Sequence, residues 1–370
     1  MKKILFLIHD LGQGGAEKVL VNLVNNMDTN KFDITVLALF GGGINDQFLK
    51  PHIRYKAVFP RSFRGNIHVM KLLSPGQLHK LFIKEHYDIE VSYLEGPSAR
   101  IISGCTDPKT KLVSWVHIEQ HTAKKASCSF RSYQEALSCY QKFDRTITVS
   151  NTVKQDFLSI YPLHAPIEVL YNTNETDDIL KKSAKPVEIG TFLSEEIKLV
   201  GVGKLLLNKG FDRMSRITKR LREDGYPVHL YILGIGPLQS KLEQFISENS
   251  LEKYITLLGY QTNPYRYISK CDLFLCASLA EGFSTAATEA LIVGTPVVTT
   301  LVSGMKEMLG EHNEYGLITE NNENSLYNGI KILLDSPELL AHYKKQAAIR
   351  GKDFSTEETV RAVEQMLEAL

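Results

Sequence analysis

The sequence predicts two doubly wound α/β domains, each built on a parallel β-sheet, with a cleft between them. The chain has 370 residues, which is too long for one average domain. Short, continuous apolar runs alternate with helical patterns almost from end to end, as is typical of parallel strands that are buried on both faces. The alternation breaks once, over residues 173–195, and then restarts. These features favour two globular domains of the same class.

The first half opens with the apolar run Ile4–Ile8, a glycine-rich turn and a helix expected from Ala16 to Met27. The run is too short for a signal peptide, so a buried strand is the better interpretation. Further strands are expected at Ile34–Leu39, Ile89–Tyr93, Leu112–Val116, Thr146–Val149 and Ile167–Leu170, with helical periodicity at Tyr133–Phe143 and Val153–Ile160.

Residues 173–195 are polar, lack a strong period and contain Pro186, which is typical of a linker. Strands are then expected at Ile197–Gly203, Val228–Leu233, Ile255–Leu258, Leu273–Cys276 and Pro296–Thr299, and helices near 210–223, 238–248, 285–293, 324–334 and 337–350. The last segment, from Phe354, resembles a capped helix. The expected organisation is a first domain over 1–172, a linker over 173–195, a second domain over 196–350 and a C-terminal helical segment over 351–370.

Charge and cysteine content exclude several classes of protein. The net charge of +1 divides into 21 Lys and Arg against 15 Asp and Glu in residues 1–172, and 22 against 27 in the rest. The mild positive charge of one half is a poor match to a nucleic-acid-binding protein. The five cysteines are scattered without a CxxC pair, which favours reduced thiols in a cytoplasmic protein over disulfides or a zinc site. No stretch approaches 18 apolar residues, so no membrane span is expected.

The first candidate site is the turn Gly12-Gln13-Gly14-Gly15-Ala16-Glu17 after the first strand. A dinucleotide fingerprint would require glycine at position 17, where Glu17 stands, so a nicotinamide or flavin site is disfavoured. Gly14 and Gly15 would let backbone N–H groups approach a ligand at a helix start. The alternative is a tight turn with no ligand.

Two lysines form the second candidate site. Lys204 and Lys209 lie five residues apart between a strand that ends at Gly203 and a helix. Fixed cations at this position would neutralise the charge that develops on a departing diphosphate. The alternative is a pair of solvated surface lysines.

Two glutamates form the third and most specific candidate site. Glu281 lies in a loop after the strand Leu273–Cys276, and Glu289 lies two turns into the helix that begins near Ser284. Glu281 can reach sugar hydroxyls, whereas Glu289 can accept hydrogen bonds from a ribose. Between them, Ser284 and Thr285 offer backbone N–H groups and hydroxyls at a helix N-terminus, which suits a phosphate.

With these motifs the chain resembles glycosyltransferase family 4, whose members have the GT-B fold and retain the anomeric configuration of the donor. The spaced glutamates match that family's motif, and Gly203–Asp212 matches its lysine segment, with Lys204 where arginine is commoner. Other segments that match are Leu233–Leu242, Leu257–Asn263, the Gly12–Glu17 turn, His117 after Trp115-Val116, Val149-Ser150 and Tyr171-Asn172. The resemblance covers nearly the whole chain. It implies that the first domain binds the acceptor, that the second binds the nucleotide sugar, and that the C-terminal helix of 351–370 packs back on the first domain.

The resemblance implies a role for each matched residue. Lys204 and Lys209 are expected on the diphosphate, Glu289 on the ribose and Glu281 on the donor sugar. The turn at Tyr260 is expected to flank the base. His117 is expected near C6 of the sugar, although a lone histidine is more often structural. The full donor-binding set comprises Gly14, Gly15, Lys204, Lys209, Gly234, Tyr260, Glu281, Phe283, Ser284, Thr285 and Glu289, and the catalytic set comprises Glu281, His117 and Lys209. Ser284 departs from the family's usual glycine.

Metal and cofactor requirements follow from the aspartates. The other main glycosyltransferase fold holds its nucleotide through a metal bound by Asp-x-Asp, and no two aspartates of this chain are spaced i, i+2. The expectation is therefore that lysines and a helix N-terminus, instead of Mg²⁺, supply the positive charge. Neither a cofactor nor a metal ligand set is predicted, and the donor, expected to be a UDP-sugar, is a substrate.

A basic stretch in the first half bears on the acceptor. No acidic residue lies between Asp46 and Glu85. The same stretch contains eight basic residues, Lys50, Arg54, Lys56, Arg61, Arg64, Lys71, Lys80 and Lys84, and the apolar residues Phe59, Phe63, Val69 and Met70 lie among them. Basic side chains near anionic lipid contribute about 1 kcal/mol each. This stretch favours a peripheral position on the inner membrane face, where a lipid-linked glycan acceptor would lie. The alternative is a solvated basic face.

Three other functions compete with this hypothesis. One is a transferase of the same fold that acts on a soluble acceptor. Another is a non-catalytic partner subunit, which should have lost the charged site residues. A nucleotide-sugar epimerase of related fold is the third.

Overall fold

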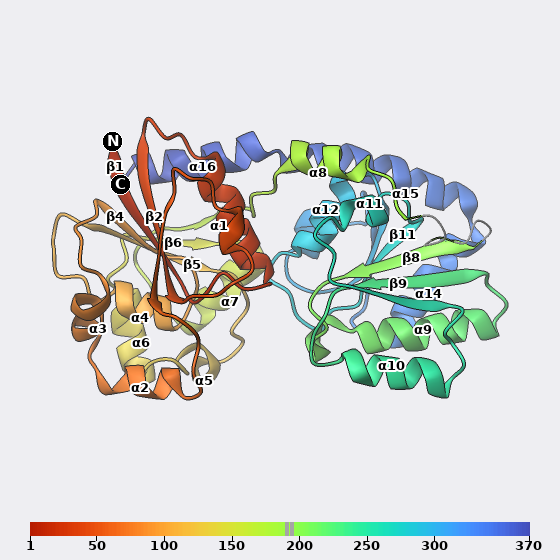
Figure 1. Cartoon of the computed structure of the whole chain (residues 1–370), viewed down its shortest axis with the longest axis horizontal. Coiled ribbons are helices and arrows are strands. Elements are labelled where there is room, and N and C mark those ends of the chain that lie inside the picture. Colours follow the sequence, from red (N-terminus) through yellow and green to blue (C-terminus); the bar gives the residue numbers. More distant parts are fainter. Residues whose placement is uncertain (189–191, 193–195) are drawn as a thin grey trace. The chain divides into compact units, whose positions relative to one another are not determined.

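The computed structural model describes residues 1–188, 192 and 196–370. The chain divides into two compact units, and each is described by itself (Figure 1). The first unit comprises Met1–Thr173 together with Glu357–Leu370, and the second comprises Asn174–Thr356. The second unit is thus inserted into the sequence of the first.

The first unit is built on a seven-stranded parallel sheet. Its strands are β1 (Lys2–Ile8), β2 (Phe32–Phe40), β3 (Arg54–Phe59), β4 (Ile89–Ser92), β5 (Lys111–Val116), β6 (Arg145–Thr148) and β7 (Ile167–Val169). The order is β3-β2-β1-β4-β5-β6-β7, so the winding reverses between β1 and β4. The central strands are buried along most of their length, because helices cover both faces of the sheet.

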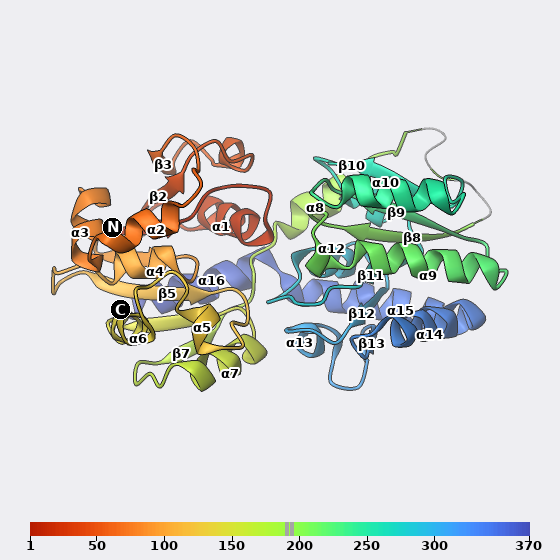
Figure 2. The same cartoon turned by 90° about the horizontal axis from the view of Figure 1, so that it is seen from below.

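Helices of the first unit form two layers. They are α1 (Gly15–Asn26), α2 (Asn66–Leu72), α3 (Pro75–Phe82), α4 (Pro97–Ile102), α5 (Ala123–Ala126), α6 (Tyr133–Tyr140), α7 (Asn151–Ile160) and α16 (Thr356–Glu368). Helix α4 packs on α3 and α6, on the face of the sheet opposite α1 and α16 (Figures 1 and 2). Tyr140 of α6 meets Phe157 of α7 edge to face, with 5.0 Å between ring centroids.

Helix α16 returns to the first unit from the far end of the sequence. It buries Val360, Val363, Met366 and Leu367, a spacing that places all four on one helical face. Lys2 Nζ donates to Leu367 O at 2.9 Å, and the backbone N–H of Asp28 donates to Glu364 Oε1 at 2.6 Å. Residues 351–356 stay in the second unit, so the returning segment is shorter than the 351–370 expected from the sequence.

The second unit is built on a six-stranded parallel sheet with the order β10-β9-β8-β11-β12-β13. Its strands are β8 (Ile197–Val202), β9 (Val228–Leu233), β10 (Ile255–Gly259), β11 (Leu273–Cys276), β12 (Val297–Thr300) and β13 (Leu317–Thr319). The winding reverses between β8 and β11. Ligands of such sheets bind at the carboxyl ends of the strands beside the reversal, which is where Lys204, Lys209 and Glu281 lie in the sequence.

Two layers of helices cover this second sheet. The helices are α8 (Thr176–Ser183), α9 (Phe211–Glu223), α10 (Gln239–Glu248), α11 (Tyr265–Ile268), α12 (Thr285–Ile292), α13 (Met305–Leu309), α14 (Glu323–Asp335) and α15 (Pro337–Arg350). Helix α9 packs on α10 and α14 along one face, and α12 packs on α8, α11 and α15 along the other (Figures 1 and 2). The core on the α9 side joins Met214 and Ile217 of α9 to Leu230 and Ile232 of β9.

The linker expected over 173–195 is wrong in its first part. Residues 176–183 form helix α8, which belongs to the second unit and buries Ile179 against it. Ser183 O accepts a hydrogen bond from Ser269 Oγ at 3.1 Å, and Asn263 Nδ2 donates to Lys182 O at 3.0 Å. One buried apolar residue in eight is too weak a period to mark a helix. Residues 189–191 and 193–195 of the expected linker lie outside the described residues.

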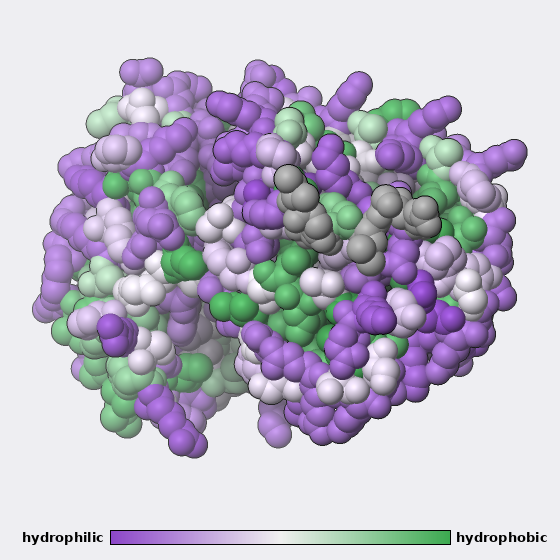
Figure 3. Space-filling model, turned by 45° about the vertical axis from the view of Figure 1, so that its right-hand side comes forward, coloured by the Kyte–Doolittle hydropathy of each residue, from purple (hydrophilic) through white to green (hydrophobic). Residues whose placement is uncertain are grey.

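Hydrophilic residues dominate the face of the molecule drawn in Figure 3, with hydrophobic residues in patches among them. Within the described residues, none of the helices has the length and apolar character that crossing a bilayer requires.

Candidate active site

An ion pair between Lys209 and Glu281 is the centre of the candidate site in the second unit. Lys209 Nζ lies 2.7 Å from Glu281 Oε1 and 2.8 Å from Oε2, so one ammonium bridges both carboxylate oxygens. Ser278 Oγ donates to Glu281 Oε1 at 2.6 Å. Glu281 is 8% exposed, whereas the Lys209 side chain is about one-third exposed. The carboxylate is therefore fixed from two sides, and the lysine still reaches solvent.

Backbone contacts explain why these two side chains meet. Lys209 ends the short 3₁₀ turn Leu207–Lys209 after β8, and Glu281 lies in the loop after β11. Gly210 follows with φ of +69°, and a Cβ there would lie 2.0 Å from Ala277 O. The backbone N–H of Leu279 donates to Asn208 O at 2.7 Å. Glycine at position 210 thus lets the two loops touch.

Glu289 lies on α12 and is 4% exposed. Tyr265 Oη of α11 donates to Glu289 Oε1 at 3.3 Å. The helix starts after Ser284, whose Oγ caps it by accepting from the backbone N–H of Ala287 at 3.4 Å. The hydroxyl of Ser284 is committed to the cap, while Thr285, in the first turn, is half-buried. The N-terminus of α12 therefore lies between the two glutamates in the sequence.

Phe283 is a predicted donor-binding residue whose aromatic ring packs inside the second unit. It is 6% exposed and packs on Phe354, with 6.1 Å between ring centroids. The side chain therefore anchors the loop before α12 to the residues that follow α15.

Lys204, Gly234 and Tyr260 follow three adjacent strands, β8, β9 and β10. The backbone N–H of Gly234 donates to Gly259 O at 2.7 Å, so the last two turns are hydrogen-bonded to each other. Lys204 is exposed. Among the described residues, its ammonium forms no ion pair with Glu281 or Glu289. The Tyr260 side chain is 39% exposed. All three lie at the carboxyl edge of the sheet, the edge that the winding reversal marks as the ligand side.

Gly14 and Gly15 lie at the start of α1 in the first unit, where Gly14 is the N-cap. The turn before them is held by Asp10, whose Oδ1 accepts from the backbone N–H of Gly12 at 2.7 Å and whose Oδ2 lies 2.7 Å from His9 Nδ1. Asn45 Nδ2 also donates to Gly12 O.

His117 follows β5 and lies among aromatic rings. Its ring centroid is 4.8 Å from that of Tyr93 and 6.2 Å from that of Trp115. Among the described residues, the enclosed Nε2 atom has no hydrogen-bond partner. Burial lowers the pKa of His117 to about 3, against the opposing effect of a hydrogen bond with the Tyr93 backbone. The imidazole is thus neutral at physiological pH.

Sequence reasoning missed three side chains that support these residues. Glu95 follows β4, and its Oε2 accepts from the backbone N–H of His117 at 3.0 Å. Burial raises the pKa of Glu95. Its signal was available, since Leu94-Glu95-Gly96-Pro97 places a charge and turn residues directly after a predicted strand. Ser278 and Tyr265, the partners of Glu281 and Glu289, have no comparable signal, because single hydroxyls are common everywhere.

Two parallel doubly wound units, with a lysine–glutamate pair and a helix N-terminus at one carboxyl edge, define the class of the GT-B transferases. Comparisons with known families agree. The family model described as Glycosyl transferases group 1 matches residues 187–350, and that described as Glycosyltransferase Family 4 matches residues 13–178. The chain belongs to the family 4 type of the group 1 glycosyltransferases.

Individual relatives extend this result. An N-acetylgalactosamine-N,N'-diacetylbacillosaminyl-diphospho-undecaprenol 4-alpha-N-acetylgalactosaminyltransferase of Campylobacter jejuni is 28% identical over 365 residues, covering 96% of each chain. Among solved structures, Anabaena HepE in complex with UDP and glucose has a TM-score of 0.79 at 19% identity, covering 100% of both chains. A Staphylococcus aureus TarM complex that contains UDP has a TM-score of 0.73 at 15% identity, covering 100% of this chain and 99% of that one. The chain has the GT-B fold and is a glycosyltransferase that uses a nucleotide sugar.

Proposed function

We propose that this enzyme transfers a hexose or N-acetylhexosamine from a UDP-sugar to a lipid-linked or surface-polysaccharide glycan, with retention of configuration and without a metal ion. The observation that carries the proposal is that Lys209 pairs with Glu281 and Tyr265 with Glu289, the two glutamates that precede and follow the α12 N-terminus in the sequence. This arrangement offers acceptors for sugar and ribose hydroxyls and positive groups for the phosphates between them.

In the proposed reaction, the acceptor hydroxyl forms a bond to the anomeric carbon while the bond from that carbon to the diphosphate breaks. The electron pair of the broken bond leaves on the diphosphate, and the acceptor's proton passes to a phosphate oxygen. Lys204, Lys209 and the α12 N-terminus stabilise the developing negative charge. Glu281 orients the sugar, and Glu289 holds the ribose. We assign His117, as a neutral imidazole, to the sugar near C6.

Retention is tested by NMR of the product. The anomeric coupling constant of the new linkage, compared with that of the donor, should show the same configuration. An inverted product would contradict the proposed front-face reaction while leaving the enzyme a glycosyltransferase.

The metal requirement is tested by assaying transfer in excess EDTA and then with added Mg²⁺ or Mn²⁺. We expect the same kcat within about twofold, because the cations of the site are side chains and a helix terminus. A loss of activity in EDTA that Mg²⁺ restores would overturn this part of the proposal.

The acceptor class rests on two observations. The Campylobacter relative, similar over nearly its whole length, is named for an undecaprenol-diphosphate-linked acceptor. The basic stretch of the first unit is also exposed. Arg61, Arg64 and Lys80 are exposed and form no ion pair among the described residues, whereas Arg54 pairs with Asp33 and Lys56 with Glu85.

Apolar side chains lie beside these free cations. Phe63 is 41%, Val69 53% and Leu72 78% exposed, whereas Met70 is buried and Phe59 stacks on Phe40. Phe63, Val69 and Leu72 with Arg61 and Arg64 form the surface that we propose lies on an anionic membrane.

Liposome flotation tests the membrane contact. Vesicles with phosphatidylglycerol should recover the protein, and neutral vesicles should recover much less. The double variant Arg61→Glu, Arg64→Glu should lose recovery, while the matched control Lys241→Glu, on exposed α10, should not. Equal recovery with both kinds of vesicle would instead favour the soluble-acceptor alternative.

A further inference from the structure

Glu90 is a carboxylate in the middle of a buried parallel strand of the first unit. It lies on β4, pairs in register with Leu5 of β1 and Leu112 of β5, and is 2% exposed. A carboxylate removed from water at such a place is costly unless a positive group compensates it. The donor site does not use Glu90, so its presence calls for a separate explanation.

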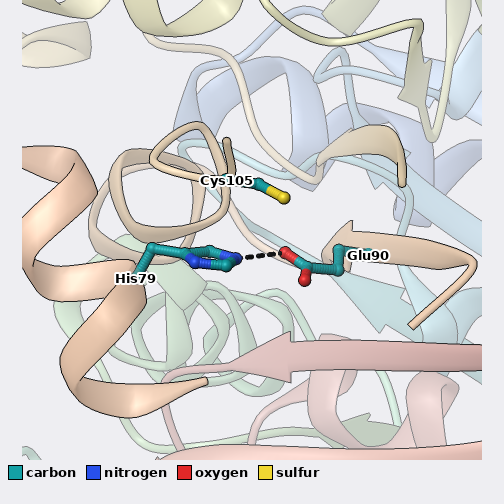
Figure 4. A group of neighbouring side chains, drawn as sticks. All are labelled: His79, Glu90 and Cys105. Carbon is teal, nitrogen blue, oxygen red and sulfur yellow. Dashed lines mark hydrogen bonds and ion pairs between the residues drawn. The ribbon is translucent and has the colours of Figure 1, made fainter. Parts of the chain in front are cut away.

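Two further ligand-type side chains meet Glu90. His79 Nε2 of α3 lies 2.8 Å from Glu90 Oε2. Cys105, in the turn after α4, completes a trio in which one nitrogen, one carboxylate oxygen and one sulfur all lie within 4.8 Å of one another. Figure 4 shows the imidazole directed at the carboxylate and the thiol next to both. The three residues come from three separate elements, so chain proximity does not explain their meeting.

The backbone holds this trio in place. A Cβ at Gly104 would lie 2.0 Å from Pro75 O, so the turn before Cys105 presses directly on the first turn of α3. Ser74 and Gln77 close that first turn with a reciprocal capping box. His79 lies four residues after Pro75, which is one helical turn, so the two residues share a face of α3. That face is the one that contacts the turn before Cys105. The arrangement is therefore fixed by packing.

Without an ion, His79 pairs with Glu90 and its side chain also hydrogen-bonds Cys105, so the imidazole lies between the carboxylate and the thiol. The same three groups suit a zinc ion, because imidazole, carboxylate and thiolate are the three side-chain ligands that Zn²⁺ takes in proteins. Calcium and magnesium do not suit nitrogen and sulfur donors. The His79 side chain is 16% exposed and Cys105 is half-buried, so solvent reaches both residues.

A second group of ligand-type side chains, Glu119, His121 and Asp156, fits a metal less well. Both oxygens of Asp156 already accept hydrogen bonds from the backbone N–H groups of Gln120 and His121, at 2.6 and 3.0 Å. In the described part of the chain, by contrast, the Glu90 carboxylate accepts no hydrogen bond from a backbone N–H group.

We propose that His79, Glu90 and Cys105 form a zinc site with three protein ligands and water as the fourth, which ties α3, β4 and the turn after α4 together. The sequence shows no zinc motif, because the ligands are spaced by 11 and 15 residues and belong to different elements. The site lies in the first unit and is independent of the donor residues of the second.

The test uses the full chain, stripped of metal by EDTA and dialysed. Zn²⁺ is titrated against a chromophoric chelator, and Co²⁺ is added to a second sample. We expect one tight equivalent of Zn²⁺ and a thiolate-to-cobalt charge-transfer band. Loss of a residue that only supports a metal ligand lowers the metal affinity by roughly 10- to 100-fold. Because they remove ligands, Cys105→Ser and His79→Gln should each lower the Zn²⁺ affinity by more than that. Cys128→Ser, an exposed free cysteine of the same unit, is the matched control and should bind as the parent does.

Three results would overturn the proposal: no cobalt–thiolate band in the unaltered protein, equal Zn²⁺ affinity of the Cys105→Ser variant, or tight binding that Asp156→Asn abolishes and Cys105→Ser leaves intact. The cobalt spectrum needs no variant, so a misfolded mutant cannot obscure the outcome. Trp115, the only tryptophan in the sequence, lies on β5 of the first unit. Thermal unfolding followed by its fluorescence should show a higher Tm when Zn²⁺ is present.

Discussion

Lys209 and Glu281 share one ion pair, so each controls the other's state. The buried carboxyl group of Glu281 accepts hydrogen bonds from the Lys209 ammonium and from the Ser278 hydroxyl. Lys209 in turn is oriented by the carboxylate, which leaves its charge partly compensated until a diphosphate arrives. We infer that donor binding redistributes this charge, because phosphate oxygens compete for the same ammonium.

Replacing Lys209 therefore tests the proposed chemistry. Lys209→Met should lower kcat by about 100- to 1,000-fold, the range for removing one electrostatic group that acts on the transition state. Lys209→Arg should recover part of the loss, since the charge is kept. Steady-state transfer assays measure both, with Lys241→Met on exposed α10 as the control. Full activity of Lys209→Met would remove the central role proposed for the pair.

His117 predicts a pH dependence of stability. Its pKa is about 3 in the folded chain and about 6.5 when unfolded. Between these values the unfolded state binds the proton and the folded state does not. The contribution of the neutral ring is therefore complete above about pH 6.5, and falls by up to about 1.4 kcal/mol per pH unit below it.

Urea unfolding, followed by Trp115 fluorescence at about pH 7 and about pH 5, measures this effect. His117→Gln cannot take up the proton and should lose less stability on acidification than the unaltered protein. His52→Gln, which changes an exposed imidazole of the same unit, should follow the unaltered protein. Parallel losses in all three proteins would show that His117 is protonated normally in the folded state.

At the scale of elements, two loops depend on one glycine. Gly210→Ala places a methyl group against Ala277 O and forces alanine to a φ of +69°. Gly225→Ala imposes a similar backbone, with φ of +91°, but its Cβ would meet nothing within 4 Å. The control should cost about 1 kcal/mol of unfolding free energy, and Gly210→Ala clearly more. Transfer assays should show a loss of kcat for Gly210→Ala alone, because the shifted loop separates Lys209 from Glu281.

The elements that sequence patterns predicted are those with long apolar runs. Strands such as Val228–Leu233 and Leu273–Cys276 have the predicted bounds, because every residue in them is buried. Strand β3 (Arg54–Phe59) was not predicted, because it lies at the sheet edge and none of its residues is buried. Its two basic residues also interrupt the apolar run that would mark a strand. Strand β13 is also an edge strand, of three half-buried residues. Position at an edge does not decide this by itself, because the edge strands β7 and β10 were predicted from the apolar runs Ile167–Leu170 and Ile255–Leu258.

The site was predictable to the extent that its residues follow strands. Placing Lys209 after β8 and Glu281 after β11 needs only the sheet topology, yet their direct pairing depends on how closely Gly210 meets Ala277. Resemblance to a family named the residues, while the hydroxyls of Ser278 and Tyr265 emerged only from contacts. The His79, Glu90 and Cys105 trio had no sequence signal for the same reason.

At the scale of the whole molecule, α16 makes the first unit depend on residues remote in sequence. Leu367 is fully buried, so Leu367→Ala should cost about 2–5 kcal/mol in the first unit. Trp115 fluorescence, which reports that unit alone, should show a lower Tm by several degrees. The exposed Arg361→Ala is the matched control. An unchanged Trp115 transition in Leu367→Ala would mean that α16 adds little to the first unit.

The interrupted first unit has a consequence for synthesis on the ribosome. The segment that seals its sheet face, Val360 to Leu367, emerges only after Asn174–Thr356 has been translated. An apolar strip of the nascent protein thus stays uncovered while the intervening unit is made, and that unit can fold first. We expect chaperones that bind apolar surface to engage ribosome-bound chains stalled before Glu357, and to release them once α16 has emerged.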